Sequence, residues 1–185
     1  MLQRIENKVV QIVRNDLVCI SIFAKIENNK TIVTSITLNN PKLSFPAQEN
    51  IGANADLKKI EHALNVFLKG QSVSFDFIAL DFSLCTSFQE KVLKAARKIP
   101  RGSIVSYSDL AAMAGYPSAI RAVASVMRNN RFPLIIPCHR VVTKPHFIGG
   151  FMGVKNGWPI VLKRKLLVLE GVQVAQSNNQ IIVQE

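Results

Sequence analysis

The sequence predicts an α+β protein of two domains, in which a small β-sheet with a helix precedes a mostly helical second half. Segments rich in Val, Ile and Thr with Asn-containing turns fill the first forty residues, whereas apolar residues at helical spacing dominate after residue 86. The 185 residues, at roughly 100–200 residues for a domain, allow one large or two small domains. We expect domains over 1–85 and 86–173, followed by a tail over 174–185.

In the first half, alternating segments separated by the turn formers Asn-Asp and Asn-Asn-Lys predict three antiparallel strands over 8–14, 17–26 and 31–38. Asn54 or Asp56 is placed to cap a helix that runs to about Lys69 and ends at the following glycine. Residues 72–80 alternate again and indicate one more extended segment. These elements make a compact α/β unit.

In the second half, Thr86 or Ser87 is predicted to cap a helix with the sequence FQEKVLKAARKI. A second helix begins at Ser106 and is closed by Gly115, and a third, SAIRAVASVMRNN, follows Pro117. Two short helices joined by a tight turn that contains glycine have the outline of a helix-turn-helix.

The net charge of +11 is concentrated in the second half. Residues 1–86 hold nine basic and eight acidic side chains, whereas residues 87–185 hold fourteen basic and four acidic ones. Such an excess is the electrostatic footprint of a polyanion partner, but a solvated basic surface would carry the same charge. Binding to a membrane surface is disfavoured because the basic residues do not lie on one amphipathic helix.

Composition excludes several classes of protein. An apolar content of 48% rules out a disordered polycation, and no run of about 18 apolar residues suggests a membrane span. The N-terminal residues carry charges every few positions, unlike a secretory signal peptide. Three scattered cysteines predict no disulfide framework and, with three distant histidines, no zinc site. We therefore expect an intracellular, cytoplasmic protein without a metal.

The segment LIIPCHRVV at 134–142 is the most informative for chemistry. Cys138 follows an apolar run and Pro137, and it is followed by His139 and Arg140, whose charges would lower a thiol pKa. A buried, inert cysteine is the more common situation for such a residue. The residues by themselves leave both interpretations open.

With its surroundings, this segment resembles the O6-alkylguanine-DNA alkyltransferase family, also called methylated-DNA–protein-cysteine methyltransferases. The resemblance rests on five ordered motifs between about Thr86 and Val172: SFQEKV, IPRGSIVSYSDLAAMAG, RAVASVMRNN, PCHRVV and LLVLEG. It implies an N-terminal RNase H-like α/β domain and a C-terminal, winged helix-like domain with the helix-turn-helix. Residues 1–85 resemble the variable N-terminal domain of the family only in outline.

The resemblance implies repair of DNA by direct reversal. Cys138 would accept the alkyl group from O6 of guanine, and less readily from O4 of thymine, while His139 acts through a water as base and Glu170 orients His139. Because a thioether has no good leaving group, the reaction would be irreversible and each molecule would react once. No cofactor is implied.

The family reaches its base by flipping it out of double-stranded DNA, which is the expected partner of a monomer. Arg121 matches the arginine that fills the gap left by the base. Tyr107 matches the tyrosine that crowds the 3′ phosphate and donates a hydrogen bond to the guanine. Asn130 matches the asparagine that fixes the turn before the active-site segment. The other positions implied to contact the base or the DNA are Ala122, Arg128, Pro133, Val141, Ile148 and Lys163, with Lys94 as a further phosphate contact.

The chain departs from the family pattern in three places. Arg131 replaces a proline after Asn130, and Ile148 stands where serine or arginine is common, which predicts a more apolar pocket rim. The segment 151–161 is longer than usual and flanks the pocket mouth, so it would affect the size of alkyl group accepted.

Two other functions fit parts of the sequence. A module that only binds alkylated bases would lack the acceptor cysteine, and a winged-helix transcription regulator would not need Cys138, His139 and Glu170 together. These three residues therefore favour alkyl transfer.

Overall fold

The computed structural model describes residues 9–43, 54–144, 146–175 and 181–182. The chain divides into two compact units, Met1–Ser83 and Leu84–Glu185. Within the described ranges, no helix has both the length and the apolar character needed to cross a bilayer. The predicted α+β class is confirmed, and each unit is described by itself below.

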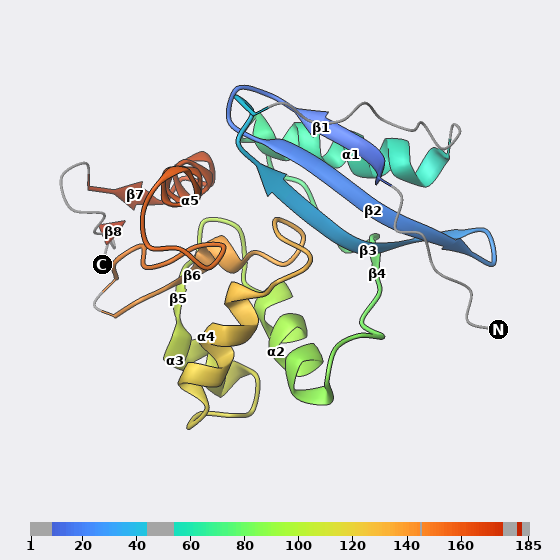
Figure 1. Cartoon of the computed structure of the whole chain (residues 1–185). Coiled ribbons are helices and arrows are strands. Elements are labelled where there is room, and N and C mark those ends of the chain that lie inside the picture. Colours follow the sequence, from blue (N-terminus) through green and yellow to red (C-terminus); the bar gives the residue numbers. More distant parts are fainter. Residues whose placement is uncertain (1–8, 44–53, 145, 176–180, 183–185) are drawn as a thin grey trace. The chain divides into compact units, whose positions relative to one another are not determined.

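The first unit is a four-stranded sheet with one helix. The strands β1 (Val9–Arg14), β2 (Cys19–Glu27) and β3 (Lys30–Asn39) form the antiparallel meander that the sequence predicts, in Figure 1 coloured blue. Within the segment 72–80, only β4 (Ala79–Leu80) pairs, and it lies parallel to β3. The sheet order is β1-β2-β3-β4.

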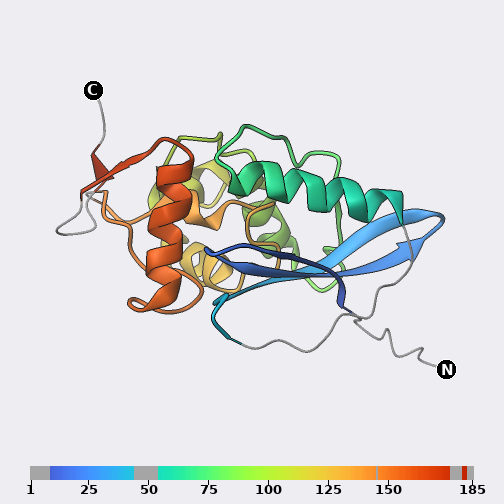
Figure 2. The ribbon, with the colours of Figure 1, turned by 90° about the horizontal axis from the view of Figure 1, so that it is seen from above.

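The helix α1 (Ala55–Leu68) runs alongside the strands, as Figure 2 shows. Of the two caps that the sequence allows, Asn54 is the one used: its side chain accepts from the backbone N–H groups of Asp56 and Leu57, at 2.8 and 3.4 Å. The apolar face of α1 is buried through Leu57, Ile60, Ala63, Leu64, Phe67 and Leu68. Cys19 is buried on β2, as the alternating pattern predicts.

The second unit contains four α-helices among its described residues: α2 (Ser87–Arg97), α3 (Tyr107–Met113), α4 (Ile120–Arg128) and α5 (Trp158–Leu169). The first three correspond to the predicted helices. α4 begins at Ile120, two residues later than predicted, and Pro117 lies in the preceding turn. α5 is a further helix, for which the sequence pattern supplied no prediction.

Short strands complete the second unit. β5 (Val105–Ser106) pairs in parallel with β6 (Val141–Val142), and β7 (Gln173–Val174) pairs antiparallel with β8 (Ile181–Ile182). The β5–β6 pair brings the residues just before α3 beside those that follow a single 3-10 turn, Cys138–Arg140. Tertiary pairing thus places the start of α3 next to the cysteine segment, although the paired residues Val105 and Val141 are far apart in sequence.

The first residues of α2 and α3 are held by capping boxes. The Thr86 hydroxyl accepts from Gln89 N–H at 3.3 Å, while the Gln89 side chain accepts from Thr86 N–H at 2.9 Å. Ser106 and Asp109 make the same reciprocal pair at the start of α3. These bonds satisfy backbone donors that a helix leaves unpaired at its first turn.

We expect Thr86→Ala to lower the free energy of unfolding of the second unit by about 1 kcal/mol, because a capped donor loses its acceptor. The matched control Ser87→Ala removes a hydroxyl one residue later without removing the cap, and should change stability by less than about 0.5 kcal/mol. Urea unfolding followed by circular dichroism measures both. Equal losses in the two variants would show that Thr86 is not the stabilising cap.

Candidate active site

The segment that leads to Cys138 is buried and held by Asn130. The Asn130 side chain donates to the carbonyl of Ile136 at 2.9 Å and accepts from the backbone N–H of Phe132 at 3.0 Å. Residues 132–139 are all buried, and Leu134 adopts a φ of 73°, unusual for a residue with a side chain. Asn130 therefore closes a tight loop over residues 130–136 and so fixes the position of Cys138.

Cys138 opens the 3-10 turn, and its residue is 7% exposed. Burial raises the pKa of the thiol, and this outweighs a hydrogen bond from Asn130 and the charge of Lys163, which act in the opposite direction. The expectation that His139 and Arg140 lower this pKa below the ordinary value is therefore wrong for the resting protein. Cys138 is held as a neutral thiol that needs a base to react.

His139 lies beside Cys138 in sequence and points into the protein, where it meets the end of α5. Its Nε2 lies 3.0 Å from Oε1 of Glu170, and both side chains are completely buried. Burial lowers the pKa of His139, although the Glu170 carboxylate acts to raise it. A neutral ring that donates from Nε2 carries its lone pair on Nδ1, the form required of a base.

The Glu170 carboxylate also accepts hydrogen bonds from Arg140 and from one backbone N–H group. Arg140 donates from Nε to Oε2 at 2.9 Å and from Nη2 to Oε1 at 2.8 Å, and the Gly102 N–H approaches Oε2 at 3.4 Å. Burial alone would raise the pKa of Glu170, but the hydrogen bonds from His139 and Arg140 outweigh it and hold the pKa at about 2. The carboxylate is thus ionised at any neutral pH.

Lys163 is the second buried cation of the site. Its Nζ donates to the carbonyls of Val141 at 2.7 Å and Gly150 at 3.1 Å. Burial lowers its pKa to about 8. The side chain is fully enclosed, so the predicted contact of Lys163 with DNA is wrong; it instead ties the end of the cysteine segment to the loop before α5.

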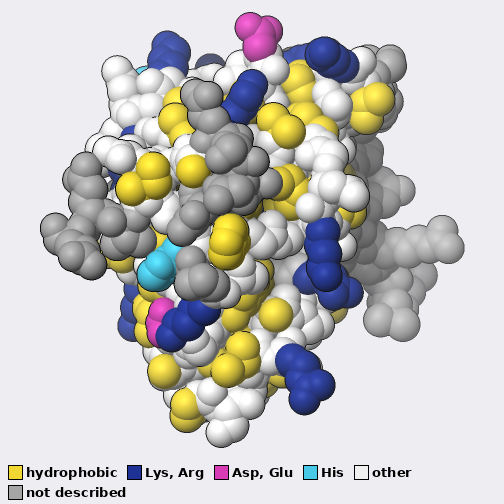
Figure 3. Space-filling view, turned by 90° about the vertical axis from the view of Figure 1, so that its left-hand side faces the viewer, with side chains coloured by type: hydrophobic (Ala, Val, Ile, Leu, Met, Phe, Trp, Pro, Cys, Tyr) yellow, Lys and Arg dark blue, Asp and Glu magenta, His cyan; other side chains and the backbone are white. Residues whose placement is uncertain are grey.

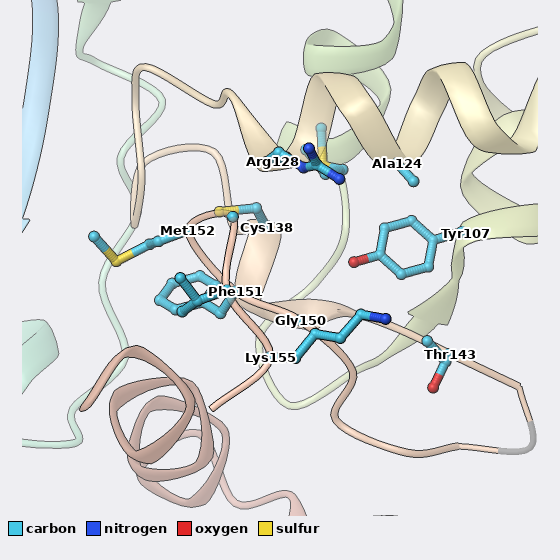
Figure 4. Close-up of a pocket in the computed structure, with 12 residues that line it drawn as sticks. Tyr107, Ala124, Arg128, Cys138, Thr143, Gly150, Phe151, Met152 and Lys155 are labelled. Carbon is cyan, nitrogen blue, oxygen red and sulfur yellow. The ribbon is translucent and has the colours of Figure 1, made fainter. Parts of the chain in front are cut away.

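Cys138 lies in a pocket of about 290 Å³. One wall comes from α3 and α4, through Tyr107, Ala124, Met127 and Arg128, and the other from Thr143 and the loop residues 150–155. Figure 4 shows the Cys138 sulfur between Arg128 and Phe151, with the Tyr107 hydroxyl turned toward the cavity. Burial raises the pKa of Tyr107, so its hydroxyl remains a hydrogen-bond donor.

A two-residue turn builds the loop wall of the pocket. Phe151 and Val154 exchange backbone hydrogen bonds at 3.0 and 3.1 Å, and Met152 and Gly153 between them have φ values of 52° and 84°. Two consecutive positive φ angles are the geometry of a type I′ turn, which favours glycine. Met152 is exposed at the pocket edge, which makes this wall apolar.

The other positions predicted to contact the base or the DNA differ in their exposure to solvent. Arg121 and Ala122 are exposed on α4, and Pro133 is buried in the loop closed by Asn130. Ile148 is completely buried and does not line the pocket, so its predicted place at the rim is wrong. Phe151 and Met152 form that apolar edge instead. The lengthened segment 151–161 was the only sequence signal that pointed to them.

The surface of the second unit suits an anionic partner. No acidic residue lines the pocket, whereas Arg128 and Lys155 do. On the face in Figure 3, Lys and Arg side chains are scattered around hydrophobic ones, and acidic side chains are sparse. The described part of the chain contains no cluster of three or more His, Cys, Asp or Glu that would hold a metal ion.

Comparisons with known proteins match the second unit to one family. The family described as "6-O-methylguanine DNA methyltransferase, DNA binding domain" matches residues 87–172. A methylated-DNA–protein-cysteine methyltransferase of Methanothermobacter thermautotrophicus is 42% identical over 118 residues, which is 64% of this chain and 63%, less than two thirds, of the relative. One from Metallosphaera sedula is 35% identical over 125 residues, covering 68% of this chain and 74% of the relative.

Among solved structures, Mycobacterium tuberculosis OGT in complex with DNA aligns with a TM-score of 0.65 at 27% identity, covering 86% of this chain and 90% of that one. The match therefore extends beyond the second unit to most of the chain. From these relatives and this fold, the chain belongs to the methylated-DNA–protein-cysteine methyltransferase family.

Proposed function

We propose that the protein repairs DNA by moving an alkyl group from O6 of guanine, and less readily from O4 of thymine, to Cys138. The observation that carries this proposal is the position of the Cys138 thiol in a pocket, directly before a buried His139–Glu170 pair. The curated relatives carry the name of this activity, which supports it. No cofactor takes part in the proposed reaction.

The reaction balances with the chain's own groups. His139 takes the thiol proton, through a water molecule, and Glu170 stabilises the imidazolium that forms. The sulfur electron pair forms a bond to the alkyl carbon, and the bond from that carbon to O6 breaks. Guanine leaves with this electron pair and takes up a proton. The stable thioether ends the protein's activity, so one molecule repairs one base.

We further propose that the alkylated base is flipped out of double-stranded DNA into the pocket by a monomer of the protein. α3 and α4 would act as a helix-turn-helix of a winged helix-like domain, with small residues of α4 allowing close approach to the minor groove. Arg121, exposed on α4, would fill the place of the base, and Tyr107 would donate to it. The first unit would be the RNase H-like domain. We propose that the protein works inside the cell, in the cytoplasm, with access to DNA.

Cys138→Ala is expected to abolish transfer, because no other cysteine is among the described residues that line the pocket. After incubation with O6-methylguanine DNA, intact mass should rise by one methyl group in the unaltered protein and not in the variant. Cys85→Ala, which removes a cysteine that lies outside the pocket, is the matched control and should react normally. A methylated Cys138→Ala protein would refute the assignment of the acceptor.

The single-turnover rate constant should rise with pH between about 5 and 9, because neutral His139 and an increasing thiolate fraction both favour reaction. His139→Gln should lower the rate on the order of 100-fold and flatten the acid side of the profile. His146→Gln changes an exposed histidine outside the pocket lining and should leave the rate unchanged. Quenched-flow measurement of methyl transfer tests this, and an unaffected His139→Gln protein would exclude His139 as the base.

Arg128→Gln should weaken binding to damaged and undamaged DNA equally and reduce the slope of log K against log salt by about 1, as expected for one lost phosphate contact. The control is Lys94→Gln, whose ammonium group already pairs with Glu90 at 2.6 Å on α2 and should contribute less. Fluorescence anisotropy over a salt series measures both slopes. A loss confined to damaged DNA would instead make Arg128 a base-recognition residue.

A further inference from the structure

Arg140 is a charged partner of the His139–Glu170 pair that the proposed reaction does not use. Its guanidinium forms two parallel hydrogen bonds to the Glu170 carboxylate, at 2.9 and 2.8 Å. A third bond, from Nη1, goes to the carbonyl of Ile99, just beyond the end of α2. The side chain is only 11% exposed, so little water screens this contact.

These bonds restrict how the Glu170 carboxylate can move. A carboxylate bound through a single hydrogen bond can rotate, whereas a fork-shaped pair fixes both oxygens in the plane of the guanidinium. Oε1 is the oxygen shared by Arg140 Nη2 and His139 Nε2. The orientation of the imidazole ring is therefore set by Arg140 as well as by Glu170.

The same bonds change the charge that His139 experiences. The groups that act on it are the Glu170 carboxylate at the end of α5, Arg140 on its own turn and Lys163 on α5; Cys138 beside it is a neutral thiol. An isolated buried carboxylate would favour the protonated ring, which cannot act as a base. Arg140 neutralises that carboxylate, and Lys163 adds a further positive charge.

From this geometry we propose that Arg140 is a positioning residue for alkyl transfer: it holds the Glu170 carboxylate in one orientation and offsets its charge, so that His139 remains neutral until it receives the Cys138 proton. The inference rests on the proposed function for its role in transfer. Its effect on His139 exists in the free protein and is measurable without DNA. A lysine would supply the charge but not the two parallel bonds.

The test combines two measurements on the full chain. Nitrogen-15 NMR of the imidazole groups between about pH 5 and 9 reports the protonation and tautomer of His139 without DNA, with the other two histidines, His62 and His146, as internal references. Single-turnover methyl transfer from O6-methylguanine DNA is measured over the same pH range. The variants are Arg140→Gln, Arg140→Lys and the matched control Arg101→Gln. Arg101 donates to the backbone carbonyl of Leu169, next to Glu170.

In the unaltered protein, His139 should be neutral at pH 7 and above, with its proton on Nε2, and become protonated only toward the acid end of the range. In Arg140→Gln, the pKa of His139 should rise, because the charge of Glu170 is no longer offset, and the acid side of the rate profile should move to higher pH with it, giving on the order of tenfold slower transfer near pH 6. Arg140→Lys should keep His139 neutral but slow transfer at every pH. Arg101→Gln should leave the His139 titration unchanged.

A folded Arg140→Gln protein with an unchanged His139 titration and a uniformly lower rate would overturn the proposal, because that is the pattern of a purely structural role. A thermal melt would reveal whether Arg140→Gln fails to fold. In that case Arg140→Lys tests the proposal: an unaltered transfer rate together with an unaltered His139 Nε2 signal would overturn it. Absence of transfer by the unaltered protein would refute the proposed function, whereas the NMR titration would still test Arg140.

Discussion

The Glu170 carboxylate, buried at the end of α5, is the group on which the second unit depends. A buried charge is tolerated only when its hydrogen bonds and its charge are satisfied, and here His139, Arg140 and the Gly102 N–H do both. Those partners come from two separate parts of the chain, the turn Cys138–Arg140 and the loop before β5. The same contacts that make the ion acceptable in the interior therefore also bring α5, the cysteine turn and the loop before β5 together. The hydrogen bonds of Glu170 therefore both stabilise the second unit and orient His139 for the proposed reaction.

This arrangement explains how a protein can keep a reactive thiol unreactive. Burial raises the pKa of Cys138, which protects it from chance reaction, and burial also lowers the pKa of His139, which keeps the ring ready to accept a proton. The two pKa shifts have one cause and opposite directions, but both favour the neutral form, because the thiol is neutral when protonated and the imidazole is neutral when deprotonated. In the proposed reaction Cys138 reacts only once, so a thiol that stays unreactive until it meets its substrate avoids an irreversible loss of activity.

Attachment to DNA and recognition of a damaged base use different features of the molecule. The excess of fourteen basic over four acidic residues in 87–185 acts on any phosphate backbone and carries no information about the base. Selectivity in the proposed reaction instead depends on the pocket of about 290 Å³ around Cys138, with the Tyr107 hydroxyl on one wall and the Phe151–Val154 turn on the other. Lys163, although basic, contributes neither to the basic surface nor to the pocket wall, because its ammonium group is buried and donates to two backbone carbonyls inside the protein.

The sequence alone determined the α+β class, the antiparallel meander and the helix of the first unit, and three helices of the second, because each depends on local periodicity or caps. It pointed to Cys138, His139 and Glu170 through the resemblance of its ordered motifs to a known family. Tertiary structure decided the rest. Whether Thr86 or Ser87 caps α2 depends on which hydroxyl meets Gln89, and the pairing of Arg140 with Glu170 joins residues 30 positions apart. The sequence predicted Lys163 at the DNA contact and Ile148 at the pocket rim, but both side chains are completely buried. Their exposure depends on segments distant in sequence that pack over them, and no local pattern encodes that packing.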